Sequence, residues 1–173
     1  MISLTELLAD ALRSAARPVV LIDGGAGAGK SSLGIALASA WGPDVQLVSM
    51  DAFYPGWDGL AAGSRIVAED VLDDREPHFD RWLWASETVG ERVDLDPNRP
   101  LIVEGCGSLT PASRARASYG VWCELDTDSR KQRALARDGA VFAREWDRWA
   151  SEEAQHWTTH RPWELADTIW RAT

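Results

Sequence analysis

A glycine-rich loop between two apolar segments constrains the fold of this 173-residue chain more than any other feature. The stretch VVLIDGGAGAGKSSLGIAL runs from Val19 to Leu37, and its glycines crowd together just before Lys30. The first apolar run is partly β-branched and ends at Asp23, which is typical of a buried strand, whereas the run after Lys30 resumes as a helical pattern. Glycines allow the backbone between the two to wrap tightly. We therefore predict a strand, a tight loop and a helix, in this order.

The loop also matches a motif that binds phosphate. Residues 24–31 fit the pattern G-x-x-x-x-G-K-[ST], with a predicted strand before it and a predicted helix after it, as the motif requires. The backbone N–H groups of such a loop surround phosphate oxygens, Lys30 reaches the β- and γ-phosphates, and the Ser31 hydroxyl binds Mg²⁺. A glycine-rich turn with an incidental lysine is the alternative. We predict a site for ATP and Mg²⁺ formed by Gly24, Gly25, Ala26, Gly27, Ala28, Gly29, Lys30, Ser31 and Ser32.

Short apolar runs, bounded by Gly, Pro or Asp, alternate with helical stretches along the rest of the chain. Such alternation is typical of a mostly parallel sheet covered by helices on both faces. The length suits one domain, residues 1–173, and residues 1–18 have the pattern of an amphipathic helix. The predicted strands are 18–23, 45–50, 100–105, 119–125 and 166–172; the predicted helices are about 30–41, 81–92, 111–117, 128–138 and 143–158, with Thr127 or Asp128 as an N-cap and Gly139 as a stop.

Two acidic residues stand at the ends of predicted strands, at the edge where open α/β sheets hold ligands. Asp51 follows strand 45–50, and its carboxylate could accept a proton from a substrate hydroxyl. An aspartate that caps a helix or a turn is the alternative. Glu104 lies near the end of the strand predicted at 100–105, in the sequence LIVEGCG. Its carboxylate could hold Mg²⁺ through water. Charge balance for Lys30 is the alternative for Glu104.

Three arginines follow the fourth predicted strand on one face of a predicted helix. Arg130, Arg133 and Arg137 are spaced i, i+3 and i+7. A solvated basic face is the ordinary interpretation of such a pattern. Because a lid commonly begins at this point of the fold, we predict that Arg133 or Arg137 neutralises charge on a transferring phosphoryl group.

Charge and composition exclude several classes of function. The formal net charge of −9 disfavours a general nucleic-acid-binding surface, which is normally basic. No apolar run approaches the roughly 18 residues of a membrane span, and the N-terminal segment lacks the pattern of a signal peptide. Cys106 and Cys123 have no metal-binding spacing, and we predict buried free thiols, as fits a reducing cytosol. We therefore predict a cytoplasmic protein with neither a membrane nor a nucleic acid as its partner.

Several stretches together resemble one family of known proteins. GGAGAGKSS, MDAFYPGWDGL, IVEG, and RALARDG followed by WDRWASEE are similar to the uridine kinase-like branch of the P-loop nucleoside and nucleotide kinases, in particular to small actinobacterial-type ATP-binding proteins. The resemblance runs from about Val19 to Ile169. It implies a P-loop NTPase fold with three α/β/α layers, a five-stranded parallel sheet of order 2-3-1-4-5 and a helical lid over roughly 133–150. It also implies ATP- and Mg²⁺-dependent phosphoryl transfer to a hydroxyl of a small molecule, with a nucleoside as the first expectation.

The same resemblance implies roles for individual residues. Asp51 matches the aspartate that activates the nucleoside 5′-hydroxyl, and Phe53 and Tyr54 are expected near the acceptor. Glu104 matches the acid near Mg²⁺, so the metal ligands would be Ser31 and Glu104. Two of the arginines match lid arginines that contact ATP phosphates. The catalytic residues implied are Lys30, Asp51, Arg133 and Arg137.

The segment after MDAFYPGWDGL departs from the family pattern. DDREPHFDRWLWA stands where the family has D-H-P-x-A-F-D, so Asp80 is the carboxylate left to bind ribose hydroxyls. Trp82 and Trp84 could stack on the acceptor or pack, and no hairpin that would hold a pyrimidine is recognised here. Other readings stay open: a kinase for a nucleoside monophosphate or another small metabolite, or a non-catalytic ATP-binding regulatory protein, as a monomer or a homodimer. A monophosphate acceptor would need an arginine cluster, for which Arg65, Arg75 and Arg81 are available.

Overall fold

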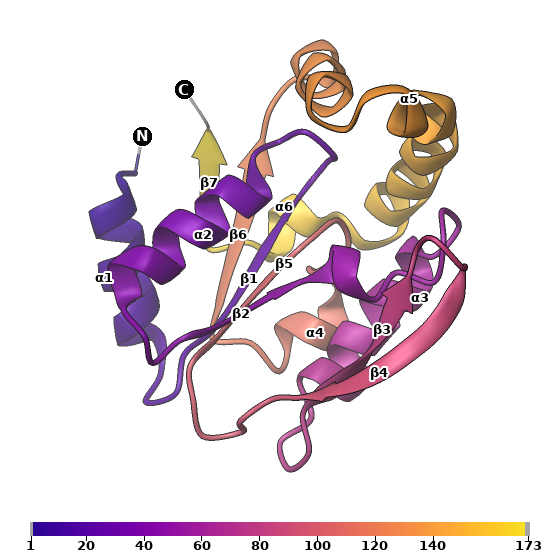
Figure 1. The fold of residues 1–173 in the computed structure, drawn as a ribbon. Helices are drawn as coiled ribbons and strands as arrows, with labels where there is room; N and C mark the ends of the chain where they lie inside the picture. Colours follow the sequence, from indigo (N-terminus) through magenta and orange to yellow (C-terminus); the bar gives the residue numbers. More distant parts are fainter. Residues whose placement is uncertain (1, 172–173) are drawn as a thin grey trace.

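A five-stranded parallel sheet forms the centre of the protein (Figure 1). The computed structural model describes residues 2–171, apart from the side chains of residues 138, 140 and 141. The strands lie in the order β2-β5-β1-β6-β7, which is 2-3-1-4-5 when only the strands of this sheet are numbered, so the predicted class and order are confirmed. Their bounds are β1 Val19–Gly24, β2 Gln46–Ser49, β5 Leu101–Glu104, β6 Tyr119–Glu124 and β7 Thr168–Arg171.

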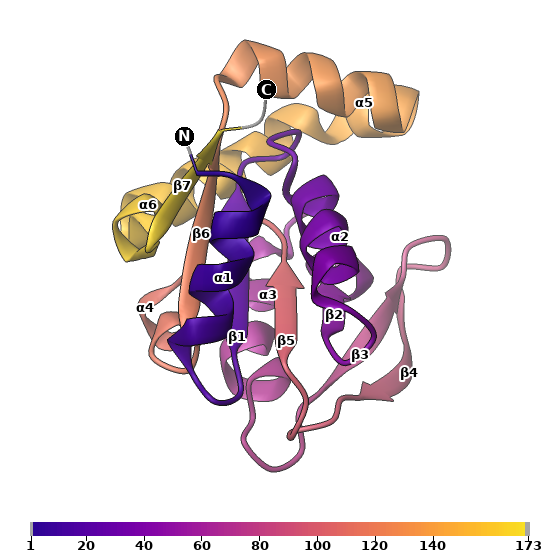
Figure 2. The same ribbon diagram turned by 90° about the vertical axis from the view of Figure 1, so that its left-hand side faces the viewer.

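Helices α1 (Leu4–Ser14) and α2 (Lys30–Trp41) cover one face of this sheet (Figure 2). The side chains of a strand alternate between the two faces, and the central strand β1 is buried on both. Val20 and Ile22 pack under α1 and α2, whereas Val19 and Leu21 belong to the core on the opposite face. The run of apolar residues from Val19 to Ile22 is therefore what a three-layer arrangement needs here.

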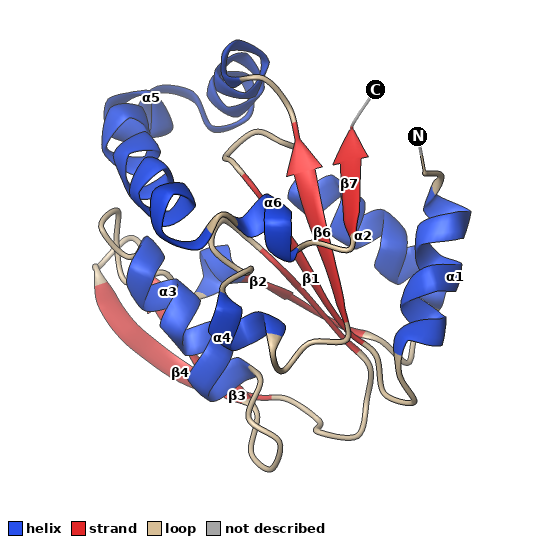
Figure 3. Cartoon of the chain, turned by 180° about the vertical axis from the view of Figure 1, so that it is seen from behind, coloured by secondary structure: helices blue, strands red, loops and turns tan. Residues whose placement is uncertain are grey.

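The opposite face is covered by α3 (Leu60–Ile66), its π-helical continuation Val67–Val71, α4 (Pro111–Arg114) and α6 (Pro162–Leu165) (Figure 3). The helix 60–71 is not in the set predicted from the sequence, because its small residues give a weak helical pattern. The predicted helix 111–117 is shorter than expected and ends at Arg114. The predicted strand 166–172 begins at Thr168, and its last residue lies outside the described residues.

The long helix α5 (Thr127–His160) crosses above the carboxyl ends of the strands, as Figures 1 and 2 show. Its backbone leaves the helical region at Gly139 (φ 63°, ψ −146°), so the two helices predicted on either side of this glycine are both present. The N-cap is Asp126 rather than Thr127 or Asp128. The backbone of Asp126 is extended, and its carboxylate accepts the backbone N–H of Ser129, which is the geometry of a cap.

The predicted helix 81–92 is wrong, because this segment forms an antiparallel hairpin of β3 (His78–Leu83) and β4 (Thr88–Asp94). Phe79 pairs with Val93, and both pack against the main core, so the hairpin is held by its inner face. Most of β4 is exposed and only Gly90 and Val93 are half-buried, so the strand has no clear period of two that would distinguish it from a helix. The chain therefore does have a hairpin between β2 and β5, although none was expected.

Candidate active site

The glycine loop has the backbone that the sequence predicts. Gly24, Gly27 and Gly29 all have positive φ, and Gly29 is the N-cap of α2 without a side-chain cap of its own. The first turn of α2 therefore presents N–H groups to the space in front of the loop, together with the positive end of the helix dipole. This arrangement is a ready binding place for phosphate groups.

Lys30 is buried at the start of α2. Its Nζ donates to the carbonyl oxygen of Gly25 at 3.0 Å and lies 3.2 Å from the Sγ of Cys106. Burial by itself lowers the pKa of Lys30, but the carboxylates of Glu104 and Glu153 and the hydrogen bond to Cys106 outweigh that effect, so the pKa lies above the ordinary lysine value. Burial raises the pKa of Cys106, which stays a neutral thiol. Lys30 is thus a fixed positive charge beside the loop.

Ser31 and Glu104 converge from neighbouring elements. The Ser31 hydroxyl, on the first turn of α2, donates to Oε2 of Glu104 at 3.1 Å, and Glu104 ends β5, which pairs with β1. Glu104 is buried, so its charge needs a partner at close range. A hydroxyl and a carboxylate are donors of the kind that Mg²⁺ takes, and this ion commonly completes its shell with water and phosphate. These two residues therefore fit the predicted metal site.

Asp51 lies in a one-turn 3-10 helix, Met50–Ala52, that directly follows β2. Its backbone carbonyl accepts the indole N–H of Trp84 at 2.9 Å, which connects the hairpin to this turn. The side chain is exposed. Asp51 thus lies at the carboxyl edge of the sheet, where the sequence predicts it.

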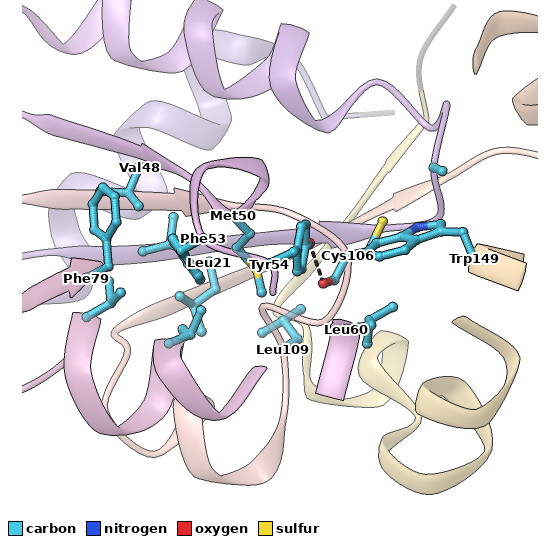
Figure 4. Packing of buried hydrophobic residues seen from close by; sticks show 14 of the residues in the cluster. Leu21, Val48, Met50, Phe53, Tyr54, Leu60, Phe79, Cys106, Leu109 and Trp149 are labelled. Carbon is cyan, nitrogen blue, oxygen red and sulfur yellow. Dashed lines mark hydrogen bonds between the residues drawn. The ribbon is translucent and has the colours of Figure 1, made fainter. Parts of the chain in front are cut away.

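These groups line a single cavity of about 570 Å³. The loop and the acids Asp51 and Glu104 form its polar side, and aromatic rings form much of the remainder. Figure 4 shows Tyr54, which donates its hydroxyl to the carbonyl of Cys106 at 2.7 Å, next to Trp149. The described lining residues are Ala26, Gly27, Gly29, Lys30, Ser31, Ser32, Asp51, Tyr54, Trp57, Trp84, Glu104, Gly105, Cys106, Arg137, Phe142 and Trp149.

No family model and no curated protein matches the sequence, whereas 55 solved chains match the structure. A protein assigned as a fructose transport system kinase from a Silicibacter species has 20% identity and a TM-score of 0.63, covering 98% of this chain and 100% of its own. One assigned as a uridine kinase from Bacillus stearothermophilus has 17% identity and a TM-score of 0.67, covering 96% of both chains. Shikimate kinase from Acinetobacter baumannii, solved with shikimate, has 16% identity and a TM-score of 0.54, covering 91% of this chain and 85% of its own.

The chain has the fold of the P-loop kinases. The sheet order that the sequence predicts belongs to this fold. At identities of 16 to 20%, the likeness concerns the fold and leaves the acceptor open.

Within this P-loop kinase fold, the predicted acceptor residues are separated. Phe53 is buried in the core against Phe79, with ring centroids 5.2 Å apart, so it supports the turn from behind. Asp80 and Trp82 lie on β3 and are not among the residues that line the cavity. Trp84, two positions beyond Trp82, does line it.

The predicted arginine face is also divided. Arg137 lines the cavity, whereas Arg133 is exposed and is not among the lining residues. Arg130 is buried under the loop, where its guanidinium bonds the Ala26 carbonyl and Oε2 of Glu153, each at 3.2 Å. All three arginines precede Gly139 in α5, so residues of one helical stretch have different surroundings here.

Sequence reasoning missed Glu153, the partner of Arg130. It is 2% exposed, and its Oε1 accepts the backbone N–H of Ala26 in the loop. A Cβ added to Gly25 would clash with the Arg130 side chain, so this glycine is needed for the close approach of α5. The two charged residues therefore hold the outer side of the loop. The pair lies 23 positions apart in α5, and no local pattern in the sequence indicates it.

Asp23, at the end of β1, is a second structural residue of the site. Its carboxylate is completely buried and accepts the N–H groups of Gly24, Gly107 and Leu109. His156 lies 3.6 Å from the same carboxylate. Asp23 thus joins the start of the glycine loop to the segment after β5. The sequence feature that indicates this role is a single acidic residue at the end of an otherwise apolar strand.

Proposed function

We propose that this protein is a Mg·ATP-dependent kinase that transfers the γ-phosphoryl group to a hydroxyl of a small molecule. The observation that carries the proposal is the convergence, in one cavity, of the glycine loop, Lys30, the Ser31–Glu104 pair and Asp51. The kinase fold of the structural neighbours agrees with it.

Each polar group has a role in this reaction. The loop amides and Lys30 bind the phosphates of ATP, and Ser31 and Glu104 hold Mg²⁺, Glu104 through water. When bound, the ion neutralises part of the charge of the phosphates. Arg137, at the cavity wall, is placed to offset charge that develops on the transferred group. Positioning and electrostatics supply most of the rate in such a reaction.

Asp51 is the proposed base. The acceptor oxygen forms a bond to the γ-phosphorus while the bond from that phosphorus to the β–γ bridging oxygen breaks, so ADP leaves. The proton of the acceptor hydroxyl passes to the Asp51 carboxylate. Glu104 is unsuited to this task because it is buried and bonded to Ser31, whereas Asp51 is exposed to the cavity.

Residues 133–150 are the proposed lid. Phe142 and Trp149 from this segment line the cavity, and Arg148 pairs with Asp58 in the loop that carries Trp57. Closure of these groups over ATP would exclude water and prevent wasteful hydrolysis.

The resemblance makes a nucleoside the first acceptor to test, in a cytoplasmic protein that acts as a monomer or a homodimer. Within residues 2–171, every helix is too short or too polar to cross a bilayer. The arginines that a nucleoside monophosphate would need, Arg65, Arg75 and Arg81, are not among the described residues that line the cavity. Arg81 pairs with Glu91 on the hairpin, and Arg65 lines a separate cavity. These placements disfavour a phosphorylated acceptor.

The test is ADP release from Mg·ATP with nucleosides, nucleoside monophosphates and small hydroxylated metabolites, using Lys30→Ala as the inactive control. Asp51→Asn should lower kcat by about 10²-fold or more while ATP still binds, because it removes the base and little of the ATP site. Full activity of Asp51→Asn would refute the role of this residue. ATP binding without turnover on any acceptor would favour a regulatory ATP-binding protein instead.

A further inference from the structure

Five aromatic side chains form the part of the cavity beyond the glycine loop, and we call them the acceptor wall. They come from three separate segments. Tyr54 and Trp57 follow the 3-10 turn after β2, Trp84 follows β3, and Phe142 and Trp149 belong to α5. Their common location therefore depends on the tertiary fold and not on one local sequence motif.

Trp57 is the centre of the acceptor wall. Its ring centroid lies 5.0 Å from that of Trp84, 5.6 Å from that of Phe142 and 6.2 Å from that of Trp149. The interplanar angles of these pairs are 55°, 41° and 86°, so none of them is parallel. At these distances the rings pack on one another, tilted or edge to face, so a ligand meets the outer faces of the wall that border the cavity and does not enter between the rings.

Asp51 is a charged lining residue that a hydrogen bond connects to the acceptor wall. Among the described lining residues, Lys30 and Arg137 are the cations, and both serve the phosphates of ATP in the proposed function. The Asp51 turn borders the acceptor wall through its bond to the indole of Trp84. An anionic acceptor would therefore meet a carboxylate and aromatic faces, which repel it.

Hydrogen-bonding groups are scarce in the acceptor wall. The Tyr54 hydroxyl donates to the Cys106 carbonyl, and the Trp84 indole donates to the Asp51 carbonyl. The other polar groups of the wall are the indole N–H donors of Trp57 and Trp149, so the wall offers donors and few acceptors. The hydroxyl and amino hydrogens of a polyol or a nucleobase would therefore stay unpaired on this surface. A quaternary ammonium group has no donor or acceptor that needs a partner.

We infer that the acceptor is an alcohol that carries a positively charged amine or quaternary ammonium group. The charged group lies against the acceptor wall through cation–π contacts, and the hydroxyl faces Asp51. This inference rests on the proposed function and names its acceptor class. The phosphoryl transfer is the one described above, with the proton passing to Asp51 and ADP leaving. The net charge of −9 also attracts a cationic acceptor to the protein.

The test compares choline with 3,3-dimethylbutan-1-ol, a neutral alcohol of nearly the same shape. Binding of each to the full chain is measured by calorimetry in the presence of Mg²⁺ and a non-hydrolysable ATP analogue, and ADP release is measured separately with Mg·ATP. Choline should bind at least about tenfold more tightly than its neutral counterpart, as expected for a desolvated cation–π site. Uridine is the neutral nucleoside used for comparison, and uridine monophosphate is the anionic nucleotide.

Two variants locate the effect. Trp57→Leu keeps an apolar side chain but removes the central ring, so it should weaken choline binding about tenfold and leave the neutral alcohol unchanged. Trp163→Leu is the matched control, because Trp163 is 38% exposed and packs on Trp122 outside the cavity. If Trp57→Leu does not fold, Trp84→Leu, at a side chain that is 37% exposed, makes the same test.

The outcomes separate the inference from the proposed function. Equal binding of choline and the neutral alcohol, or tighter binding of uridine or its monophosphate, overturns the inference. Turnover of uridine in that case leaves the proposed kinase intact. Selective choline binding that depends on Trp57, without ADP release on any acceptor, supports the ammonium site and refutes the kinase.

Discussion

Arg130 and Glu153 form a buried ion pair against the glycine loop, and removing one partner tests how the loop is held. Their side chains are 6% and 2% exposed, with 3.2 Å between the guanidinium Nη1 and Oε2. Glu153→Leu leaves the guanidinium buried without its carboxylate and the Ala26 N–H without its acceptor. Loss of one member of a buried pair costs about 3–5 kcal/mol, so we expect the free energy of unfolding to fall by that amount.

Two further variants divide this cost. Glu153→Gln keeps an oxygen that can accept the Ala26 N–H but removes the charge, so it isolates the electrostatic part of the loss. The double variant Arg130→Met/Glu153→Leu removes both charges and fills the same space with apolar atoms. Its stability should return to within about 1–2 kcal/mol of the wild type, because no buried charge is left unpaired. The wild type, Arg130→Met, Glu153→Leu and the double variant form a double-mutant cycle.

Urea unfolding followed by tryptophan fluorescence measures these differences, and thermal unfolding checks them. For a domain of this size, each kcal/mol changes Tm by roughly 2–4 °C, so Glu153→Leu should lower Tm on the order of 10 °C. A loss below about 1 kcal/mol in Glu153→Leu would show that the guanidinium finds water or another partner. A double variant that loses the sum of the two single losses would show that the residues act independently.

Two other predictions concern the loop and a histidine. Gly27→Ala should abolish measurable ATP binding, because φ is +80° and the added methyl group would clash with the first turn of α5. Gly42→Ala also has a positive φ, +105°, but open space around it, so it should cost only about 1–3 kcal/mol of strain. Calorimetry with ATP distinguishes the two variants. Burial, and then the histidine one turn earlier, lower the pKa of His160 below its usual value near 6.5. The unfolded chain therefore binds more protons than the folded chain below about pH 6.5, and the free energy of unfolding falls as the pH drops through this range. Between about pH 7.5 and pH 5.5, the Tm of His160→Gln should therefore decrease less than the Tm of the wild type. An equal decrease in both proteins would contradict this assignment.

The parallel sheet and the glycine loop could be predicted because their signals are local. Strand β1 is apolar at consecutive positions, and the loop motif has a fixed spacing, so both are visible in a short window of sequence. The buried free cysteines could also be predicted from their apolar surroundings. Asp51 and Glu104 followed from the rule that parallel strands end at one edge.

The remainder of the site depends on contacts between distant segments. The acceptor wall combines residues from 54 to 149, and the Arg130–Glu153 pair meets only because α5 bends at Gly139. The sequence of the hairpin predicts a helix because Trp82, Leu83 and Trp84 form a dense apolar group without a clear period. The family resemblance predicts Phe53 near the acceptor, whereas its ring fills the core.

The hairpin has a consequence for how this protein can change over evolutionary time. β3 and β4 pair only with each other, lie between β2 and β5 in the chain, and reach the cavity through Trp84, which follows β3. The glycine loop, Lys30 and Glu104 belong to the separate five-stranded sheet and its helix α2. On the proposed function, a lineage can therefore exchange or lengthen this hairpin, and so change the acceptor, while the half that carries the glycine loop is inherited unchanged.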